Sequence, residues 1–144
     1  MCDGSVLTVK NINSPYYYSV GGRVGFGENS VAAVERETYE ETGIRFKAGK
    51  LAFVHENFFD ADFLDDTPTH EISFYYMMEP PPGPLVFRCD SRRMDGGEES
   101  LRWLPLDKLD EYEVYPEFYK TDLRDAFKGV RHYITEKGVT RLVL

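Results

Sequence analysis

The sequence predicts an α/β protein, an α/β/α sandwich in which helices flank a mixed β-sheet. The chain has 144 residues, which suits a single domain with its own core. Segments with the alternation or the β-branched and aromatic content of strands are interrupted by one long helical segment, and a second helical pattern follows near the C-terminal end. Strands and helices in this order are typical of helices packed on a mixed sheet. We expect one domain spanning residues 1–144.

The positions of the elements follow from the residue pattern. The expected strands are residues 6–9, 16–20, 44–59, 71–78, 85–88 and 101–104, the expected helices are residues 31–42 and 117–128, and the tail 130–144 carries short β-prone runs. The run 71–78 is apolar nearly throughout, which predicts a mostly buried strand.

The ends and the packing face of the helix 31–42 can also be predicted. A short polar residue suits its N-cap and a glycine suits its left-handed C-terminal end. One arc of the helix should anchor it on a sheet. The N-cap candidates are Asn29 and Ser30, the C-terminal glycine is Gly43, and the anchoring residues are Val31, Val34 and Thr38.

Three glutamates share one face of this helix. Because a helix turns about 100° per residue, Glu37, Glu40 and Glu41 fall within an arc of about 100°. Glu28 lies just upstream, in a loop containing several glycines. Arg36 is spaced to hold the Glu40 carboxylate at i,i+4. A row of glutamates is often no more than a solvated face, but glycines let a backbone bend tightly around a ligand, which favours a site here.

Clustered carboxylates repel each other unless a positive charge lies among them. A hard divalent cation, Mg²⁺ or Mn²⁺, takes oxygen ligands and keeps coordination positions for water and a substrate phosphate. The glutamate face therefore predicts a protein that works on a phosphate compound through bound metal.

Residues 22–44 (GRVGFGENSVAAVERETYEETGI) resemble the Nudix box, G-x5-E-x7-R-E-U-x-E-E-x-G-U, where U is a bulky aliphatic residue. The matching positions are Gly22, Glu28, Arg36, Glu37, Glu40, Glu41, Gly43 and Ile44. Thr38 departs from the pattern, because it stands where the family usually has Leu, Val or Ile. Threonine keeps a β-branched shape, so we expect some loss of packing and unchanged chemistry.

The resemblance implies a Nudix-type fold and a metal-dependent hydrolase that cleaves a pyrophosphate bond in a nucleoside diphosphate derivative. It implies Mg²⁺ (or Mn²⁺) held by the Gly22 carbonyl, Glu37, Glu40, Glu41 and a late-loop glutamate. That glutamate is Glu99 ahead of Glu98, and either it or Glu37 would be the general base. Two alternatives remain: a catalytically silent Nudix domain that senses nucleotides, although such domains typically lose box glutamates, and an isopentenyl diphosphate isomerase, although neither Cys2 nor Cys89 stands where its cysteine is expected.

Residues outside the box are candidates for contacting substrate. Tyr17, in a run of three tyrosines, could stack on a base. Arg23 lies within the glycine loop, and His70 lies at the start of a predicted strand. Each has a more ordinary interpretation as a packing or solvent-facing residue. The substrate itself is not readable, because specificity lies in variable loops.

Composition narrows the partners and the location. A formal net charge of -8 argues against sequence-independent nucleic-acid binding. Two cysteines without CxxC spacing indicate neither a disulfide scaffold nor a zinc site. The chain has no long apolar run and no signal-peptide shape, so we expect a cytoplasmic protein that acts on a small nucleotide, away from membranes, as a monomer or homodimer.

The N-terminal end suggests a shortened sheet. Residues 1–4 look like the turn that normally follows a first strand, so the first strand is expected to be truncated. The strand 6–9 would then have an open edge. We expect residues 139–144, from the same chain or from a second subunit, to cover that edge.

Overall fold

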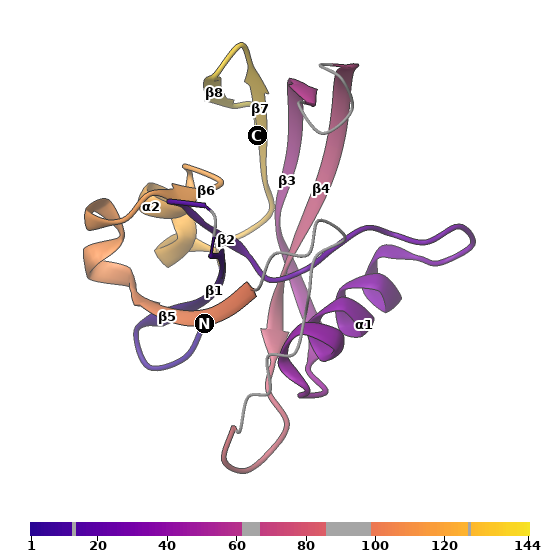
Figure 1. Ribbon diagram of the computed structural model, residues 1–144, viewed down its shortest axis with the longest axis vertical. Helices are drawn as coiled ribbons and strands as arrows, with labels where there is room; N and C mark the ends of the chain where they lie inside the picture. Colours follow the sequence, from indigo (N-terminus) through magenta and orange to yellow (C-terminus); the bar gives the residue numbers. More distant parts are fainter. Residues whose placement is uncertain (13, 62–66, 86–98, 127) are drawn as a thin grey trace. The chain divides into compact units, whose positions relative to one another are not determined.

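The computed structural model describes residues 1–12, 14–61, 67–85, 99–126 and 128–144 (Figure 1). The chain divides into two compact units. The first contains Met1–Gly49 and Met78–Arg124, and the second contains Lys50–Met77 and Asp125–Leu144. Each unit has its own four-stranded mixed sheet. The expected strand 85–88 lies largely outside the described residues.

The sheet of the first unit has the strand order β5-β1-β2-β6. Its strands are β1 (Ser5–Asn11), β2 (Tyr17–Ser19), β5 (Glu99–Pro105) and β6 (Val114–Tyr115). β1 runs antiparallel to β2 and β5, while β6 runs parallel to β2. The apolar side chains of Val6, Val9, Leu104 and Val114 are buried, so this sheet carries much of the core of the first unit.

The expectation about the edge of the first strand is wrong. β1 pairs with β2 on one side and with β5 along its whole length on the other. The edge is therefore covered by β5 along the whole strand and by β2 along residues 8–10. The tail 139–144 instead forms β8 (Val139–Leu142), which pairs with β7 (Arg131–Glu136) in the other sheet. Residues 2–5 do form the expected turn, closed by reciprocal backbone hydrogen bonds between Cys2 and Ser5.

The helix α1 (Ser30–Thr42) follows the glycine loop and agrees closely with the predicted 31–42. Asn29 is its N-cap and accepts a hydrogen bond from the backbone N–H of Ala32 at 2.9 Å. Gly43 ends it with a φ of 72°, a left-handed conformation that favours glycine. The packing face differs from the prediction, because Val31 is 44% exposed. The buried residues are Ala33, Thr38, Glu41 and Thr42.

The second predicted helix is much shorter than expected. Residues 117–128 form only α2 (Tyr119–Asp122) and the 3-10 turn η3 (Leu123–Asp125), preceded in the chain by the 3-10 helix η2 (Leu106–Glu111). The first turn of α2 uses i→i−3 bonds from Tyr119 and Lys120, the tighter geometry that rarely extends far. The segment is held by the burial of Phe118, Leu123 and Ala126 and not by a long helix.

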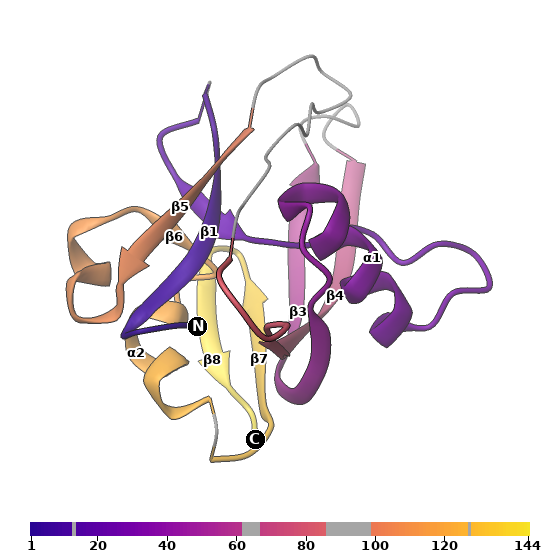
Figure 2. The ribbon, with the colours of Figure 1, turned by 90° about the horizontal axis from the view of Figure 1, so that it is seen from below.

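The sheet of the second unit has the order β4-β3-β7-β8, with β3 (Lys47–Ala61) beside β4 (Thr67–Glu79) (Figure 2). β7 is parallel to β3. The ring of Phe53 is buried against Tyr75 and Tyr133, with centroids 6.5 and 6.1 Å away. The expectation that residues 71–78 are mostly buried is wrong, because every second side chain of an edge strand can face outward and Ile72 and Phe74 are 52% and 44% exposed.

The predicted α/β class is thus confirmed, with mixed sheets and few helices. Within the described ranges, no helix has the length and apolarity needed to cross a membrane.

Candidate active site

The loop between β2 and α1 lies directly against two of the predicted site glutamates. The backbone N–H of Gly21 donates a hydrogen bond to Oε2 of Glu41 at 3.0 Å. The next residue, Gly22, is packed so closely on Glu37 that a Cβ at this position would collide with the Glu37 carboxyl group. Any side chain at position 22 would therefore force the Glu37 carboxyl group to move.

Arg36 holds three acidic side chains around this loop. Its Nε and Nη2 donate to the two carboxylate oxygens of Glu28, both at 2.9 Å, while Nη1 donates to Glu37 at 2.7 Å and to Glu40 at 3.3 Å. The paired bonds to Glu28 have the bidentate geometry that guanidinium favours. Together with a hydrogen bond from the Gly25 N–H, they lower the pKa of Glu28 to about 2. The predicted Arg36–Glu40 contact is confirmed.

The same arginine also fixes the backbone of the loop. Its Nη2 donates to the carbonyl oxygen of Arg23 at 3.1 Å. The Gly25 N–H donates to Oε2 of Glu28 at 2.9 Å. The glycine loop is therefore tied to α1 through Arg36 and Glu28, which gives the Glu28 and Arg36 positions of the box a structural role.

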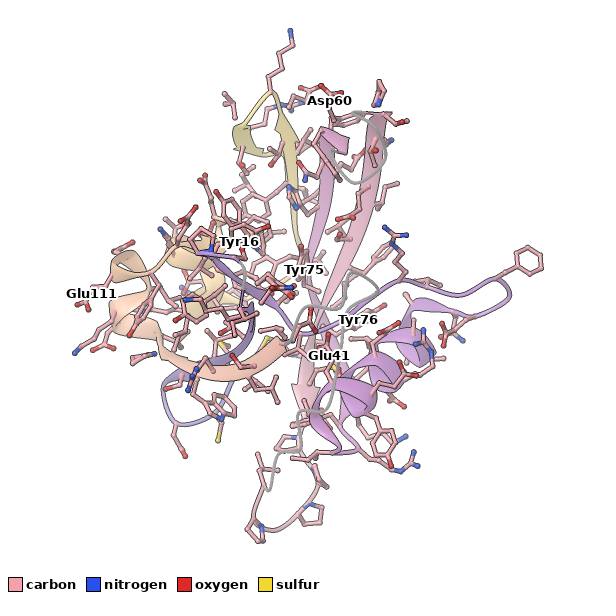
Figure 3. The ribbon with its side chains drawn as sticks, viewed as in Figure 1. Tyr16, Glu41, Asp60, Tyr75, Tyr76 and Glu111 are labelled. Atoms are coloured by element: carbon pink, nitrogen blue, oxygen red, sulfur yellow. The ribbon has the colours of Figure 1, made fainter. Side chains whose placement is uncertain are left out.

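Glu41 is the most perturbed acid of the group. Its side chain projects from α1 (Figure 3), and the residue is only 9% exposed. Burial raises its pKa to about 8, with further increases from the charges of Glu99, Glu37 and Glu40, against a lowering by the Gly21 N–H. A carboxylate that is hard to ionise beside three others is the arrangement that a bound cation relieves. The perturbation marks these glutamates as a functional-site candidate.

Glu99 reaches this group from a distant part of the sequence. It is the first residue of β5, paired with Asn11 at the end of β1. The phenol of Tyr18, on β2, donates a hydrogen bond to Oε1 of Glu99 at 2.5 Å. Glu98, the other late-loop candidate, lies outside the described residues.

The donor set suits a hard divalent cation, because it consists of carboxylate and backbone oxygens. In the part of the chain that the structure describes, no three His, Cys, Asp or Glu side chains are already arranged as a metal centre. The reason is visible in the contacts, since Glu37 and Glu40 are both turned onto Arg36. The oxygen donors of these residues suit a divalent cation, and the charges of the other acids act on Glu41. The side chains would have to rearrange to hold the cation.

The predicted substrate contacts are dispersed. The ring of Tyr17 packs edge-on against Tyr112 at 5.6 Å and beneath the Lys10 ammonium at 5.0 Å. Because side chains alternate along a strand, Tyr17 lies on the face of β2 opposite to Tyr18. Arg23 is exposed in the glycine loop.

His70 belongs to the second unit. It stacks on Phe58, with ring centroids 4.1 Å apart, and contacts the Glu56 carboxylate at 3.0 Å. Glu56 also contacts His132 at 2.9 Å. Within its own unit, His70 is therefore part of a polar chain across β4, β3 and β7.

The profile of the NUDIX domain matches residues 1–122. This chain belongs to the NUDIX family. A MutT-like protein of Streptomyces ambofaciens is 26% identical over 145 residues, covering 98% of this chain and 80% of that protein. The crystal structure of the mutator MutT protein from Bacillus halodurans has a TM-score of 0.60 at 16% identity, covering 97% of this chain and 90% of that one.

The solution structure of the E. coli ORF135 protein has a TM-score of 0.53 at 21% identity, covering 88% of this chain and 81% of that one. At such identities the two solved structures support the fold alone. Membership in the NUDIX family supports hydrolase activity on nucleoside-diphosphate-linked compounds in general, and NUDIX hydrolases generally use divalent metals such as Mg²⁺.

Sequence reasoning missed one residue of the site, Tyr18. Its hydrogen bond joins positions 81 residues apart in the chain. The alternation of β2 could have separated Tyr17 from Tyr18. The Nudix resemblance implied a role for Glu99, but no local pattern indicates that β5 pairs with β1 and brings Glu99 within reach of Tyr18.

Proposed function

We propose that the protein is a metal-dependent hydrolase that cleaves a pyrophosphate bond of a nucleoside diphosphate derivative by attack of water at phosphorus. The observation that carries the proposal is the raised pKa of the buried Glu41, about 8, among Glu99, Glu37 and Glu40. Arg36 supplies a single positive charge to several carboxylates, and an excess of negative charge costs free energy. The presence of this cluster beside a glycine loop therefore supports a role in binding a cation with a phosphate compound.

We propose that Glu37, Glu40, Glu41, Glu99 and the carbonyl of Gly22 would hold Mg²⁺ or Mn²⁺. When bound, the cation would neutralise diphosphate charge and lower the pKa of a water molecule. Glu37 and Glu40, which contact Arg36 at 2.7 and 3.3 Å, would turn from Arg36 toward the cation. The backbone N–H of Gly21 would keep the Glu41 carboxylate in place.

The general base is proposed to be Glu99 or Glu37, which would accept the proton of the attacking water while the phosphate leaving group departs in line. The charges of both acids act on the buried Glu41, whose pKa they help to raise. Substitution distinguishes the two candidates: loss of the base should lower kcat by about 10²- to 10⁴-fold with a smaller effect on KM.

For substrate recognition we propose Arg23 near the phosphates, since its backbone is fixed at the site by Arg36. Tyr17 and His70 remain proposals as substrate contacts. We further propose that residues 1–144 act as one domain, in the cytoplasm, as a monomer or homodimer. With a net charge of -8, the substrate is a small nucleotide and not a nucleic-acid polymer bound by its backbone.

The test is turnover of a substrate panel: dinucleoside polyphosphates, ADP-ribose, sugar nucleotides, NADH, and ordinary and oxidised nucleoside triphosphates. Wild type should release phosphate or nucleoside monophosphate in Mg²⁺ and lose activity in excess chelator. Glu41→Gln should lose most activity, whereas the matched control Glu136→Gln, a 58% exposed side chain in β7, should keep it. Turnover in chelator, or full turnover by Glu41→Gln, would overturn the proposal. Nucleotide binding without turnover would indicate a silent binding module.

A further inference from the structure

We propose that Tyr18 is a positioning residue that orients Glu99 for the reaction. The inference rests on the proposed function, because it assigns Tyr18 a role through an acid of the candidate site. Its basis is the hydrogen bond from the Tyr18 phenol to Oε1 of Glu99 at 2.5 Å. This length is at the short end for a hydroxyl that donates to an ionised carboxylate, one of the stronger kinds of hydrogen bond in proteins.

The sheet register explains why a tyrosine is needed for this contact. Tyr18 pairs with Val9 of β1, and Glu99 pairs with Asn11 on the other side of β1. Val9 and Asn11 are two residues apart, so all four side chains lie on the same face. The backbones of Tyr18 and Glu99 are therefore separated by the intervening strand β1. Because neighbouring strands lie about 4.8 Å apart, this separation is roughly 10 Å. The long side chains of tyrosine and glutamate together span this gap, whereas a serine or threonine at position 18 would be too short.

The position of Glu99 makes such a restraint useful. Glu99 is the first residue of β5, and a glutamate side chain has three torsions to fix. It also lies close enough to Glu41 to raise the pKa of that acid. Repulsion among these acids would displace the Glu99 carboxylate, and the hydrogen bond from Tyr18 opposes that displacement.

The segment that holds Glu99 also holds Glu41. Tyr18 donates to Glu99, and Gly21, three residues later, donates through its backbone N–H to Glu41 at 3.0 Å. Gly22 follows and abuts Glu37. Residues 18–22 therefore set the spacing of three acids that come from α1 and β5. Removing the phenol hydroxyl would remove a hydrogen bond to Glu99 and leave the Gly21 bond to Glu41 in place.

The test compares Tyr18→Phe with the control Tyr112→Phe. Both remove only a hydroxyl from the first unit, and Tyr112 packs against Tyr17 at 5.6 Å. Because loss of a residue that orients a ligand typically costs about 10- to 100-fold in metal affinity or activity, Tyr18→Phe should lower kcat about 10-fold or more with little change in KM. It should also weaken Mn²⁺ binding measured by electron paramagnetic resonance, a readout independent of turnover. Tyr112→Phe should leave both unchanged.

A double substitution decides whether Tyr18 acts through Glu99. In a Glu99→Gln background, Tyr18→Phe should have no further effect on kcat or Mn²⁺ affinity, because residues that act as a unit are not additive. Normal kcat and normal Mn²⁺ affinity in Tyr18→Phe would overturn the inference, as would losses that multiply in the double variant. If Glu99→Gln is fully active while Glu41→Gln is not, the inference falls and the proposed function stands. If wild type hydrolyses no nucleotide, the proposed function falls, and the Mn²⁺ affinities alone uphold or overturn the role of Tyr18.

Discussion

The buried Glu41 should make the stability of the metal-free protein fall as the pH rises. Its pKa is about 8 in the folded protein, against 4.5 for an ordinary glutamate. Between these values the folded protein keeps the proton and the unfolded chain has lost it, so the folded state binds more protons. Stability therefore decreases with pH through this window and levels off above about pH 8.

The magnitude can be worked out from the shift. One pKa unit corresponds to about 1.4 kcal/mol, so the full window from 4.5 to about 8 is worth on the order of 5 kcal/mol. The measurement is best made between pH 6.5 and pH 8. Burial lowers the pKa of His55 from its ordinary value of 6.5, so His55 contributes most of its own pH dependence below this range. Within it, the loss of unfolding free energy should be about 1.5–2 kcal/mol.

Glu41→Gln isolates this contribution. Glutamine is nearly isosteric, and its carbonyl oxygen can still accept the hydrogen bond from the Gly21 N–H. The other shifted group that titrates in this range, the Met1 amino group with its lowered pKa, is present in both proteins and cancels in the difference. We expect the Glu41→Gln protein to gain stability over wild type by about 1.5–2 kcal/mol between pH 6.5 and pH 8.

The assay is urea unfolding in chelator at several pH values, with the free energy extrapolated to water. Adding Mg²⁺ should remove most of the pH dependence in wild type, because a cation favours the ionised carboxylate, and should have little effect on Glu41→Gln. A difference between the two proteins that stays constant from pH 6.5 to pH 8 would refute the reasoning about burial and repulsion at Glu41.

Three further substitutions test the supports of the site. Arg36→Lys should lower activity by about 10-fold or more, since a lysine cannot reproduce the bidentate contact that helps to order the loop; unchanged kinetics would contradict this. Gly22→Ala should impair activity and Mn²⁺ binding together, because its Cβ collides with the Glu37 carboxyl group, and a normal Mn²⁺ titration would show that the acid moves aside freely. Asn29→Ala should cost about 1 kcal/mol of stability by removing the N-cap bond to Ala32, measured by urea unfolding with kcat as the control, and an unchanged midpoint would argue against the cap.

Local features were the most predictable from sequence. The ends of α1 followed from Asn29 and Gly43, because capping depends on residues adjacent in the chain. The Arg36–Glu40 contact likewise followed from helical spacing. The glutamate face was predicted from the same periodicity. Glu41, one of its members, is buried, and the charges of Glu37 and Glu40 act on it.

Features that depend on strand pairing were less predictable. The sequence suggested that the strand 6–9 had an open edge, whereas β5 covers it. Such pairing joins distant residues through backbone groups that every sequence shares, so no local pattern encodes the partner. The contact between Tyr18 and Glu99 depends on that register and could not be inferred without it. The alternation of side chains along β2 places Tyr18, and not Tyr17, on the face with Glu99.

The most direct test of the central claim is hydrolysis in ¹⁸O-labelled water with Mg²⁺, using the best substrate of the panel. Water attack at phosphorus predicts one ¹⁸O atom in a phosphate-containing product of the wild-type reaction, detected by mass spectrometry. Incorporation should disappear in chelator and fall sharply in Glu41→Gln. Product without label at phosphorus, or labelling that persists in Glu41→Gln at the wild-type rate, would contradict the assignment of this glutamate cluster as the hydrolytic site.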